Sequence, residues 1–138
     1  MKKILSVLVL AICILSVNFC SADPYENNPD YIYIGTYGSG GYSNYLYRPS
    51  VDVQEYNPPH YQISGTFVSY GGKYTKSENW ATHCVRYNWY TKETFSLKNG
   101  YWVKDEVQDN LDSQPVRTNR KFADALFRAA YGMDFYGY

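Results

Sequence analysis

The sequence has no excess of either charge. Its 138 residues include 13 basic and 13 acidic side chains, for a formal net charge of +0. A protein that binds nucleic acid or an anionic surface through its overall electrostatic field needs a marked basic excess. The composition therefore argues against a nucleic-acid partner. The length fits a single domain.

The chain also lacks an apolar run long enough to cross a bilayer. Residues 4–17 form the longest run, and these 14 residues fall short of the roughly 20 that a transmembrane helix needs. The run follows Lys2 and Lys3 and precedes Cys20 and Ala22, which is the layout of a secretory signal peptide with small residues at the −3 and −1 positions. We predict cleavage after Ala22 and a protein that is secreted, periplasmic or displayed at the cell surface.

Two alternatives to this cleavage stay open. A retained membrane anchor is disfavoured by the length of the apolar run, and after cleavage no transmembrane segment remains. A lipid attached to Cys20 is disfavoured because bulky Phe19 stands before it, where lipoprotein processing requires a small residue.

Cysteine is scarce. Cys13 and Cys20 lie in the predicted signal peptide, so Cys84 has no partner for an intramolecular disulfide. One cysteine and two histidines without CxxC or HxxxH spacing do not make a closed zinc site, and we expect no metal and no cofactor. The core must rely instead on the aromatic residues, which number 17 Tyr, 6 Phe and 3 Trp.

Catalytic motifs are missing as well. The sequence contains no GxSxG, SxxK or HExxH string, and the glycine-rich residues 38–41 lack the Lys and Ser/Thr of a phosphate-binding loop. His83 precedes Cys84, but neighbours on a strand point to opposite faces, so only His60 could activate the thiol from another strand. We therefore expect no catalytic residues.

Carboxylates could in principle pair as acid and base across a cleft, but solvated strand edges explain them better. These are Asp52, Glu55, Asp105 and Glu106. An enzyme remains the third hypothesis, and it requires a pocket in which His60, His83 or Cys84 meets a carboxylate.

The sequence does contain a series of short patterns typical of antiparallel strands. Gly65 interrupts one inward-facing row and predicts a bulge or a bend in its strand. Asn99 and Gly100 predict a type I′ hairpin turn. The patterned segments are residues 31–37, 42–48 and 50–56 on either side of Pro49, 60–70, 81–97 as two strands or one bent strand, and 101–107.

One amphipathic helix is predicted at residues 118–131, after a polar connection. Phe122, Leu126 and Ala129 lie along one stripe, Thr118 or Asn119 can cap the start, and Gly132 can end the helix. The aromatic tail, residues 133–138, is expected to pack back on the body as an extended piece.

These elements predict an α+β fold that is mainly β. We expect a curled antiparallel sheet of about five to seven strands, as a half-barrel or small barrel, with the C-terminal amphipathic helix packed on it. Residues 1–22 would be the signal peptide, 23–30 a loop or tether, and 31–138 the single domain.

The order of features over residues 31–131 resembles the surface-adhesin protein E family of small exported bacterial domains. The likeness is carried by YIYIGT (31–36), YLYRPSVDV (45–53), ISGTFVSY (63–70), VRYNWYTKETFSL (85–97), NGYW (99–102) and FADALFRAAY (122–131). Where the family is expected to have an acidic residue after the second strand, this chain has Arg48 and Pro49. The resemblance implies a one-domain antiparallel fold with a C-terminal helix, located outside the cytoplasm and without recognised catalytic residues.

The tyrosines favour a binding surface over the other function classes. A core of this size cannot hide every ring, and Tyr combines rigid contact area with a hydroxyl group. The first hypothesis is a module that binds a protein or glycan at the cell exterior through exposed rings. The alternative is a structural envelope component that self-assembles through its edge strands as a homo-oligomer. The aromatic surface candidates are Tyr42, Tyr45, Tyr47, Tyr70, Tyr74, Tyr90 and Trp102.

Overall fold

The computed structural model describes residues 23–137 except 39, 74–75 and 106–113, and for 114–118 it describes the backbone alone. It contains one antiparallel sheet in which each strand pairs with the next along the chain. The elements are β1 (Tyr31–Tyr37), β2 (Tyr42–Asn57), β3 (His60–Gly71), β4 (Ser77–Asn88), β5 (Glu93–Lys98), β6 (Tyr101–Lys104) and α2 (Gln114–Tyr131).

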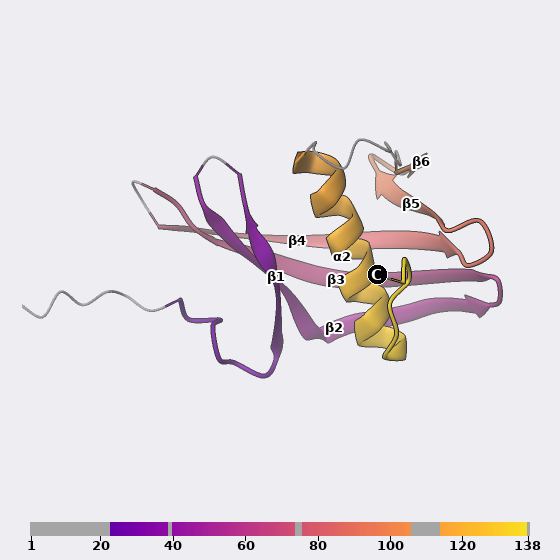
Figure 1. The fold of residues 1–138 in the computed structure, drawn as a ribbon, viewed down its shortest axis with the longest axis horizontal. Helices are drawn as coiled ribbons and strands as arrows, with labels where there is room; N and C mark the ends of the chain where they lie inside the picture. The colour runs from indigo at the N-terminus through magenta and orange to yellow at the C-terminus, as the bar shows by residue number, and fades with distance from the viewer. Residues whose placement is uncertain (1–22, 39, 74–75, 106–113, 138) are drawn as a thin grey trace, which may run out of the picture.

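The mainly β fold with one packed helix is as predicted, and the sheet is open. Its six strands run in the order β1 to β6, and β1 does not pair with β6, so the small-barrel alternative is wrong. Helix α2 crosses the long strands on one face of the sheet (Figure 1).

The main core lies between α2 and this inner face of the sheet. Leu126 and Phe127 of the helix are buried against Leu46, Ile63 and Tyr87 of the strands. Alternation along each strand places these side chains on the same face, because successive residues point to opposite sides. The hydroxyl of Tyr87 donates to the carbonyl of Ala123 at 2.9 Å, so the buried polar atom has a partner.

Gly65 lies opposite an irregularity of the sheet and also leaves room for the helix. Its pairing with β4 is unbroken, but the register of β2 against β3 shifts opposite Gly65, between the pairs Tyr47–Thr66 and Asp52–Ser64. A Cβ atom at Gly65 would stand 2.7 Å from Cδ1 of Leu126 and 3.1 Å from Cδ1 of Leu46. The absent side chain therefore lets α2 approach the sheet closely.

The irregularity lies in the neighbouring strand, at the proline that was expected to separate two pieces. β2 is continuous through Pro49, but its register against β3 shifts between Tyr47 and Asp52. Proline cannot donate to the ladder. The hydroxyl of Ser50 accepts from the backbone N–H of Thr66 at 2.8 Å and donates to the carbonyl of Tyr47 at 2.6 Å, which bridges the gap in the ladder.

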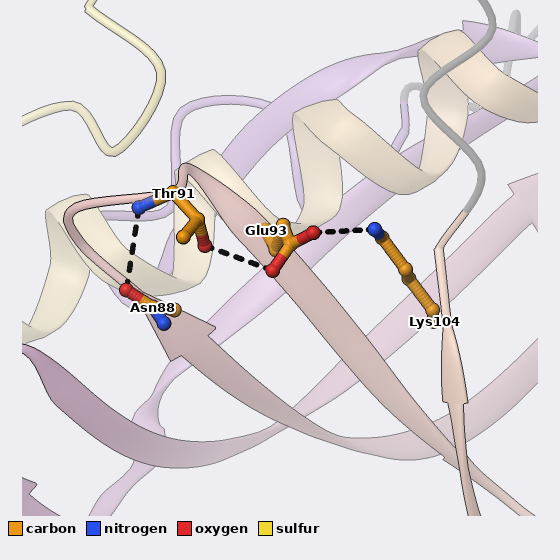
Figure 2. Close-up of polar contacts among 4 residues, drawn as sticks. All are labelled: Asn88, Thr91, Glu93 and Lys104. Carbon is orange, nitrogen blue, oxygen red and sulfur yellow. Dashed lines mark hydrogen bonds and ion pairs between the residues drawn. The ribbon is translucent and has the colours of Figure 1, made fainter.

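Two strands, β4 and β5, occupy the segment for which one bent strand was the alternative. Asn88 Oδ1 accepts from the backbone N–H of Thr91 at 3.3 Å, and the hydroxyl of Thr91 donates to Glu93 at 2.9 Å. Glu93 also forms an ion pair with Lys104 of β6 (Figure 2). These contacts hold the turn between β4 and β5 and attach β6 to β5.

The predicted Asn99–Gly100 turn is confirmed. Both residues have positive φ, of 50° and 82°, as a type I′ turn requires. The strand that follows is shorter than expected and ends at Lys104.

The helix begins earlier than predicted. It starts at Gln114, so the expected caps at Thr118 or Asn119 are wrong. Pro115 falls in the first turn, where no intrahelical N–H is needed. Gly132 ends the helix as expected, with φ of 72° and its N–H donating to the carbonyl of Arg128 at 2.8 Å.

The C-terminal segment packs back on the body, as predicted, although it bends instead of extending. Phe135 is fully buried, and the backbone N–H groups of Phe135 and Tyr136 donate to Asp124 Oδ1 at 2.9 and 3.1 Å. Lys92 donates to the carbonyl of Phe135 at 2.7 Å. These bonds tie the chain end to both the helix and the turn between β4 and β5.

Candidate binding surface

The face of the sheet opposite α2 carries a set of aromatic rings at the end formed by β1 and the first half of β2. In β1, Ile32 and Ile34 pack toward the main core, so the alternating Tyr31 and Tyr33 lie on the outer face. Register pairs Tyr31 with Tyr47 and Tyr33 with Tyr45. Aligned alternation in two neighbouring strands thus gathers four tyrosines.

Three further rings complete this group, which we call the outer tyrosine cluster. Tyr70 comes from the end of β3 and Trp80 from the beginning of β4, whereas Tyr25 comes from the loop before β1. The cluster consists of Tyr25, Tyr31, Tyr33, Tyr45, Tyr47, Tyr70 and Trp80, and each ring is in contact with at least one other.

Tyr25 is the centre of the cluster. Its ring centroid lies 4.7 Å from that of Tyr31, 5.6 Å from Tyr45, 5.7 Å from Tyr70 and 6.0 Å from Trp80, and only 9% of the residue is exposed. Residues 23–30 form turns beside β1 and away from α2 (Figure 1). The segment expected to be a loop or tether is therefore docked on the sheet.

Hydrogen bonds attach the loop of residues 23–30 to Tyr45, a buried ring of the outer tyrosine cluster. Asp23 accepts from the hydroxyl of Tyr45 at 2.7 Å and from the backbone N–H of Tyr25 at 3.0 Å. Burial, followed by the hydrogen bond to Asp23, raises the pKa of Tyr45. Burial, followed by a hydrogen bond with Glu78, raises the pKa of Tyr25. Both hydroxyls therefore stay protonated at neutral pH and act as donors.

A hollow of about 430 Å³ opens between the loop and the exposed edge of the cluster. Tyr33 at its rim is 58% exposed, and Trp80, elsewhere in the cluster, is 42% exposed. Among the residues that the structure describes, two carboxylates line the hollow and no basic side chain does. The lining residues are Asp23, Tyr25, Glu26, Asn27, Tyr31, Tyr33, Ser43 and Tyr45.

The structure brings together three of the aromatic residues predicted for binding, Tyr45, Tyr47 and Tyr70. Of these, Tyr45 is only 4% exposed and supports the surface from beneath, while Tyr47 and Tyr70 are half-buried. Tyr74 lies outside the described residues.

The other predicted aromatics lie apart from the cluster. Tyr42 is half-buried and pairs with Tyr37 at the far end of β1 and β2. Tyr90 is 82% exposed in the turn between β4 and β5. Trp102 of β6 lies beneath the guanidinium group of Arg86, 4.1 Å from its ring centroid.

Sequence reasoning missed Tyr25, Tyr31, Tyr33 and Trp80. The YIYI alternation of β1 was the available signal for Tyr31 and Tyr33, since it places tyrosines and isoleucines on opposite faces. Predicting Trp80 required knowledge of the pairing between β3 and β4, which places Trp80 opposite Val68. Tyr25 had no local signal, because its burial depends on how the loop folds back.

A second, smaller hollow of about 230 Å³ lies near the other end of the sheet, and it includes His60, Glu55 and Glu93. No hydrogen bond joins His60 to either carboxylate among the residues that the structure describes. Glu93 is held by Lys104 and Thr91, whose hydrogen bonds keep its pKa below the ordinary value (Figure 2). Its two oxygens are thus engaged in holding strands together.

Cys84 and His83 point to opposite faces of β4, as expected. His83 packs against Phe67 and Phe122, with ring centroids 5.2 and 5.9 Å away. The thiol of Cys84 donates to Gln54 at 3.2 Å, and burial raises its pKa. A thiol with a raised pKa is a poor nucleophile at neutral pH.

Within the described part of the chain, no three His, Cys, Asp or Glu side chains are grouped as a metal site would require. Over the same residues, no helix combines the length and apolar character needed to cross a membrane. Comparisons with models of known protein families, with curated proteins and with solved structures found no match.

Proposed function

We propose that this chain is an exported, non-catalytic binding module that recognises a protein or glycan at the cell exterior through the outer tyrosine cluster. The observation that carries the proposal is the gathering of seven aromatic rings on the face of the sheet that α2 leaves uncovered. Export is supported by the signal-peptide pattern of residues 1–22.

The physical support comes from the partial exposure of rigid rings. Tyr and Trp side chains supply contact area at a low cost in conformational entropy, and their polar atoms can still bond a partner. In this cluster the buried rings of Tyr25 and Tyr45 hold the rings around them in place, so the exposed Tyr33 and Trp80 are preorganised. Preorganisation lowers the cost of binding.

The test compares exposed aromatics inside and outside the cluster. The purified chain is screened against immobilised glycans and extracellular-matrix proteins, and the hits are repeated with Tyr33→Ala, Trp80→Ala and Tyr90→Ala. We expect the first two variants to lose at least about tenfold in affinity, equivalent to about 1.4 kcal/mol. Tyr90→Ala is the matched control, because Tyr90 is more exposed than either but lies in a distant turn. Equal binding by all variants would overturn the proposal.

The alternative of a self-assembling envelope component is favoured by one observation, the open sheet. In the described structure β1 and β6 each present an edge that pairs with no other strand. Near the β6 edge, Leu97, Tyr101 and Val103 are exposed. Unpaired edges are templates for strand addition.

Sedimentation velocity over a wide concentration range tests this alternative. Self-assembly through β6 predicts larger species that disappear in Val103→Lys, because a lysine on an edge strand opposes pairing. A monomer at every concentration would exclude it and leave the binding proposal in place.

A further inference from the structure

We propose that the hollow at the outer tyrosine cluster binds a quaternary ammonium group, as carried by choline. This inference rests on the proposed binding function and names the class of ligand that the hollow would take. It is drawn from the charge, the ring content and the hydrogen bonding of the lining residues.

The hollow is lined by four tyrosine rings and two carboxylates. Tyr25, Tyr31, Tyr33 and Tyr45 supply the rings, which contact one another at centroid distances of 4.7 to 5.6 Å. The face of an aromatic ring carries partial negative charge and attracts a cation within about 6 Å of its centroid. Several rings around one space form an aromatic cage, the arrangement by which proteins commonly bind quaternary ammonium ligands.

The charges of the lining residues also favour a cation. Asp23 and Glu26 contribute two negative charges, against the one positive charge of the α-amino group that the predicted cleavage after Ala22 would leave on Asp23, and the described lining residues include no Lys or Arg. One basic group in contact with the cluster is Lys76, which lies over Tyr70 at 5.8 Å from the ring centroid, and Tyr70 is outside the lining. A cation is therefore favoured in the hollow, whereas a phosphate or carboxylate is repelled.

Existing hydrogen bonds argue for a cation that has no donors of its own. Both oxygens of Asp23 already accept bonds, from the hydroxyl of Tyr45 and the backbone N–H of Tyr25. The hydroxyl of Tyr25 is engaged with Glu78. A primary ammonium entering the hollow must replace the bonds that its three N–H donors make to water, and each oxygen of Asp23 has already used one acceptor site. A trimethylammonium group loses no such bonds and can rest against the rings.

The size of the hollow agrees with a small ligand. Its volume of about 430 Å³ lies within the range of roughly 300–1,000 Å³ seen for small-molecule sites. Tyr33, at the rim, is exposed enough for its ring face to be reached from solvent.

The experiment is a titration of the purified full chain with choline, with the backbone amide NMR spectrum recorded at each choline concentration. We expect shifts at Asn27, Tyr31, Tyr33 and Ser43 that saturate at millimolar choline or below. The neutral carbon isostere 3,3-dimethylbutan-1-ol has the same shape without the charge, and it should bind at least about tenfold more weakly. Glycine betaine, which adds a carboxylate to the trimethylammonium group, should also bind more weakly.

Three variants separate ring, charge and fold. Tyr33→Phe keeps the ring and should retain choline binding, whereas Tyr33→Leu keeps an apolar side chain without the ring and should lose about fivefold or more. Glu26→Gln should weaken choline and leave the neutral isostere unchanged. Amide spectra without ligand show whether each variant keeps the fold.

The outcomes are distinct from those of the parent proposal. Equal binding of choline and its neutral isostere, or no shifts at the lining residues, would overturn the ammonium assignment. If Tyr33→Ala still loses the glycan or protein partner in that case, the binding function stands and only the ligand class is wrong. If no variant affects any partner, both proposals are wrong.

Discussion

The two faces of the sheet are formed by alternate residues of the same strands, but one face is covered by α2 and the other is only partly covered. On the inner face, Leu46 and Ile63 are buried beneath α2 and its Phe127, and almost no surface is left exposed. On the outer face, a single loop covers part of an aromatic cluster, and Tyr33 and Trp80 stay open to solvent. The inner face needs apolar bulk to stabilise the domain, whereas the outer face keeps rings with polar groups available for contact.

The comparison also explains how the tyrosines are divided. Tyr87 on the inner face is buried and bonds the helix backbone. Tyr45 on the outer face is equally inaccessible, yet its hydroxyl bonds the side chain of a loop residue, Asp23. Burial alone therefore does not distinguish a core tyrosine from a tyrosine of the candidate site in this tyrosine-rich chain. The two kinds are distinguished by the partner of the hydroxyl group and by the exposure of the neighbouring rings.

The largest expected effect is on the inner face. Phe127→Ala removes a buried ring that contacts Tyr61, Tyr87, Trp89 and Phe135, and it should lower the free energy of unfolding by about 3–5 kcal/mol. Urea unfolding measures this loss of free energy, and Tyr101→Ala, which removes an exposed ring, is the control. A loss no larger than that of Tyr33→Ala would remove the distinction between the faces.

A second prediction concerns the closeness of α2 to the sheet. Gly65→Ala places a methyl group against Leu126 and Leu46 and should cost about 1–3 kcal/mol by overpacking. The combined variant with Leu126→Ala should lose less than the two single losses added together, because the second change removes one clashing side chain. Strict additivity in urea unfolding would contradict the close approach.

A third prediction concerns the attachment of the loop to the outer face. Tyr45→Phe removes the hydroxyl that donates to Asp23 and should cost about 0.5–1.5 kcal/mol. Backbone amides of residues 23–30 should exchange hydrogen faster, while those of α2 should not change. Unchanged exchange in the loop would show that ring packing alone holds it.

The smallest expected effect is a dependence on pH at the cluster edge. Hydrogen bonds from the indole of Trp80 and from Tyr25 hold the pKa of Glu78 below its ordinary value of 4.5. A lowered pKa in the folded state means that Glu78 contributes stability above that ordinary value and loses it as the pH falls through the folded pKa.

Unfolding experiments at pH 6 and in acid should therefore show a smaller loss for Glu78→Gln than for the unmodified chain. Asp52→Gln is a suitable control, since Asp52 is an exposed carboxylate outside the cluster. An identical acid dependence of the Glu78 variant and the unmodified chain would contradict the bonding at this edge.

Much of the fold could be predicted because its signals are local. Alternation in β1 and β3 and the Asn99–Gly100 pair depend on neighbouring residues. Pro49 was misleading because the hydroxyl of its neighbour Ser50 accepts from the backbone N–H of Thr66 and replaces the missing ladder contact, a pairing that the local sequence does not reveal. Gly65 indicated the irregularity between β2 and β3, but its second role, the close approach of Leu126, depends on a residue far along the chain.

The candidate site was less predictable than the fold. Tyr45, Tyr47 and Tyr70 could be selected as tyrosines on strands, and alternation places Tyr45 and Tyr47 on one face, but nothing local indicated that Tyr70 would join them. Tyr90 and Trp102 satisfied the same criteria and lie elsewhere. Tyr25 joins the cluster only because Asp23 and the sheet hold its loop in place, which is a long-range effect.

Hydroxyl-radical footprinting of the chain with and without a bound partner tests the central claim most directly. The account predicts that Tyr33 and Trp80 become protected from oxidation on binding, while Tyr90 and Tyr101, which are more exposed in the free chain, keep their reactivity. Protection of Tyr90 or Tyr101 with Tyr33 and Trp80 unchanged would place the contact elsewhere and contradict the assignment of function to the outer tyrosine cluster.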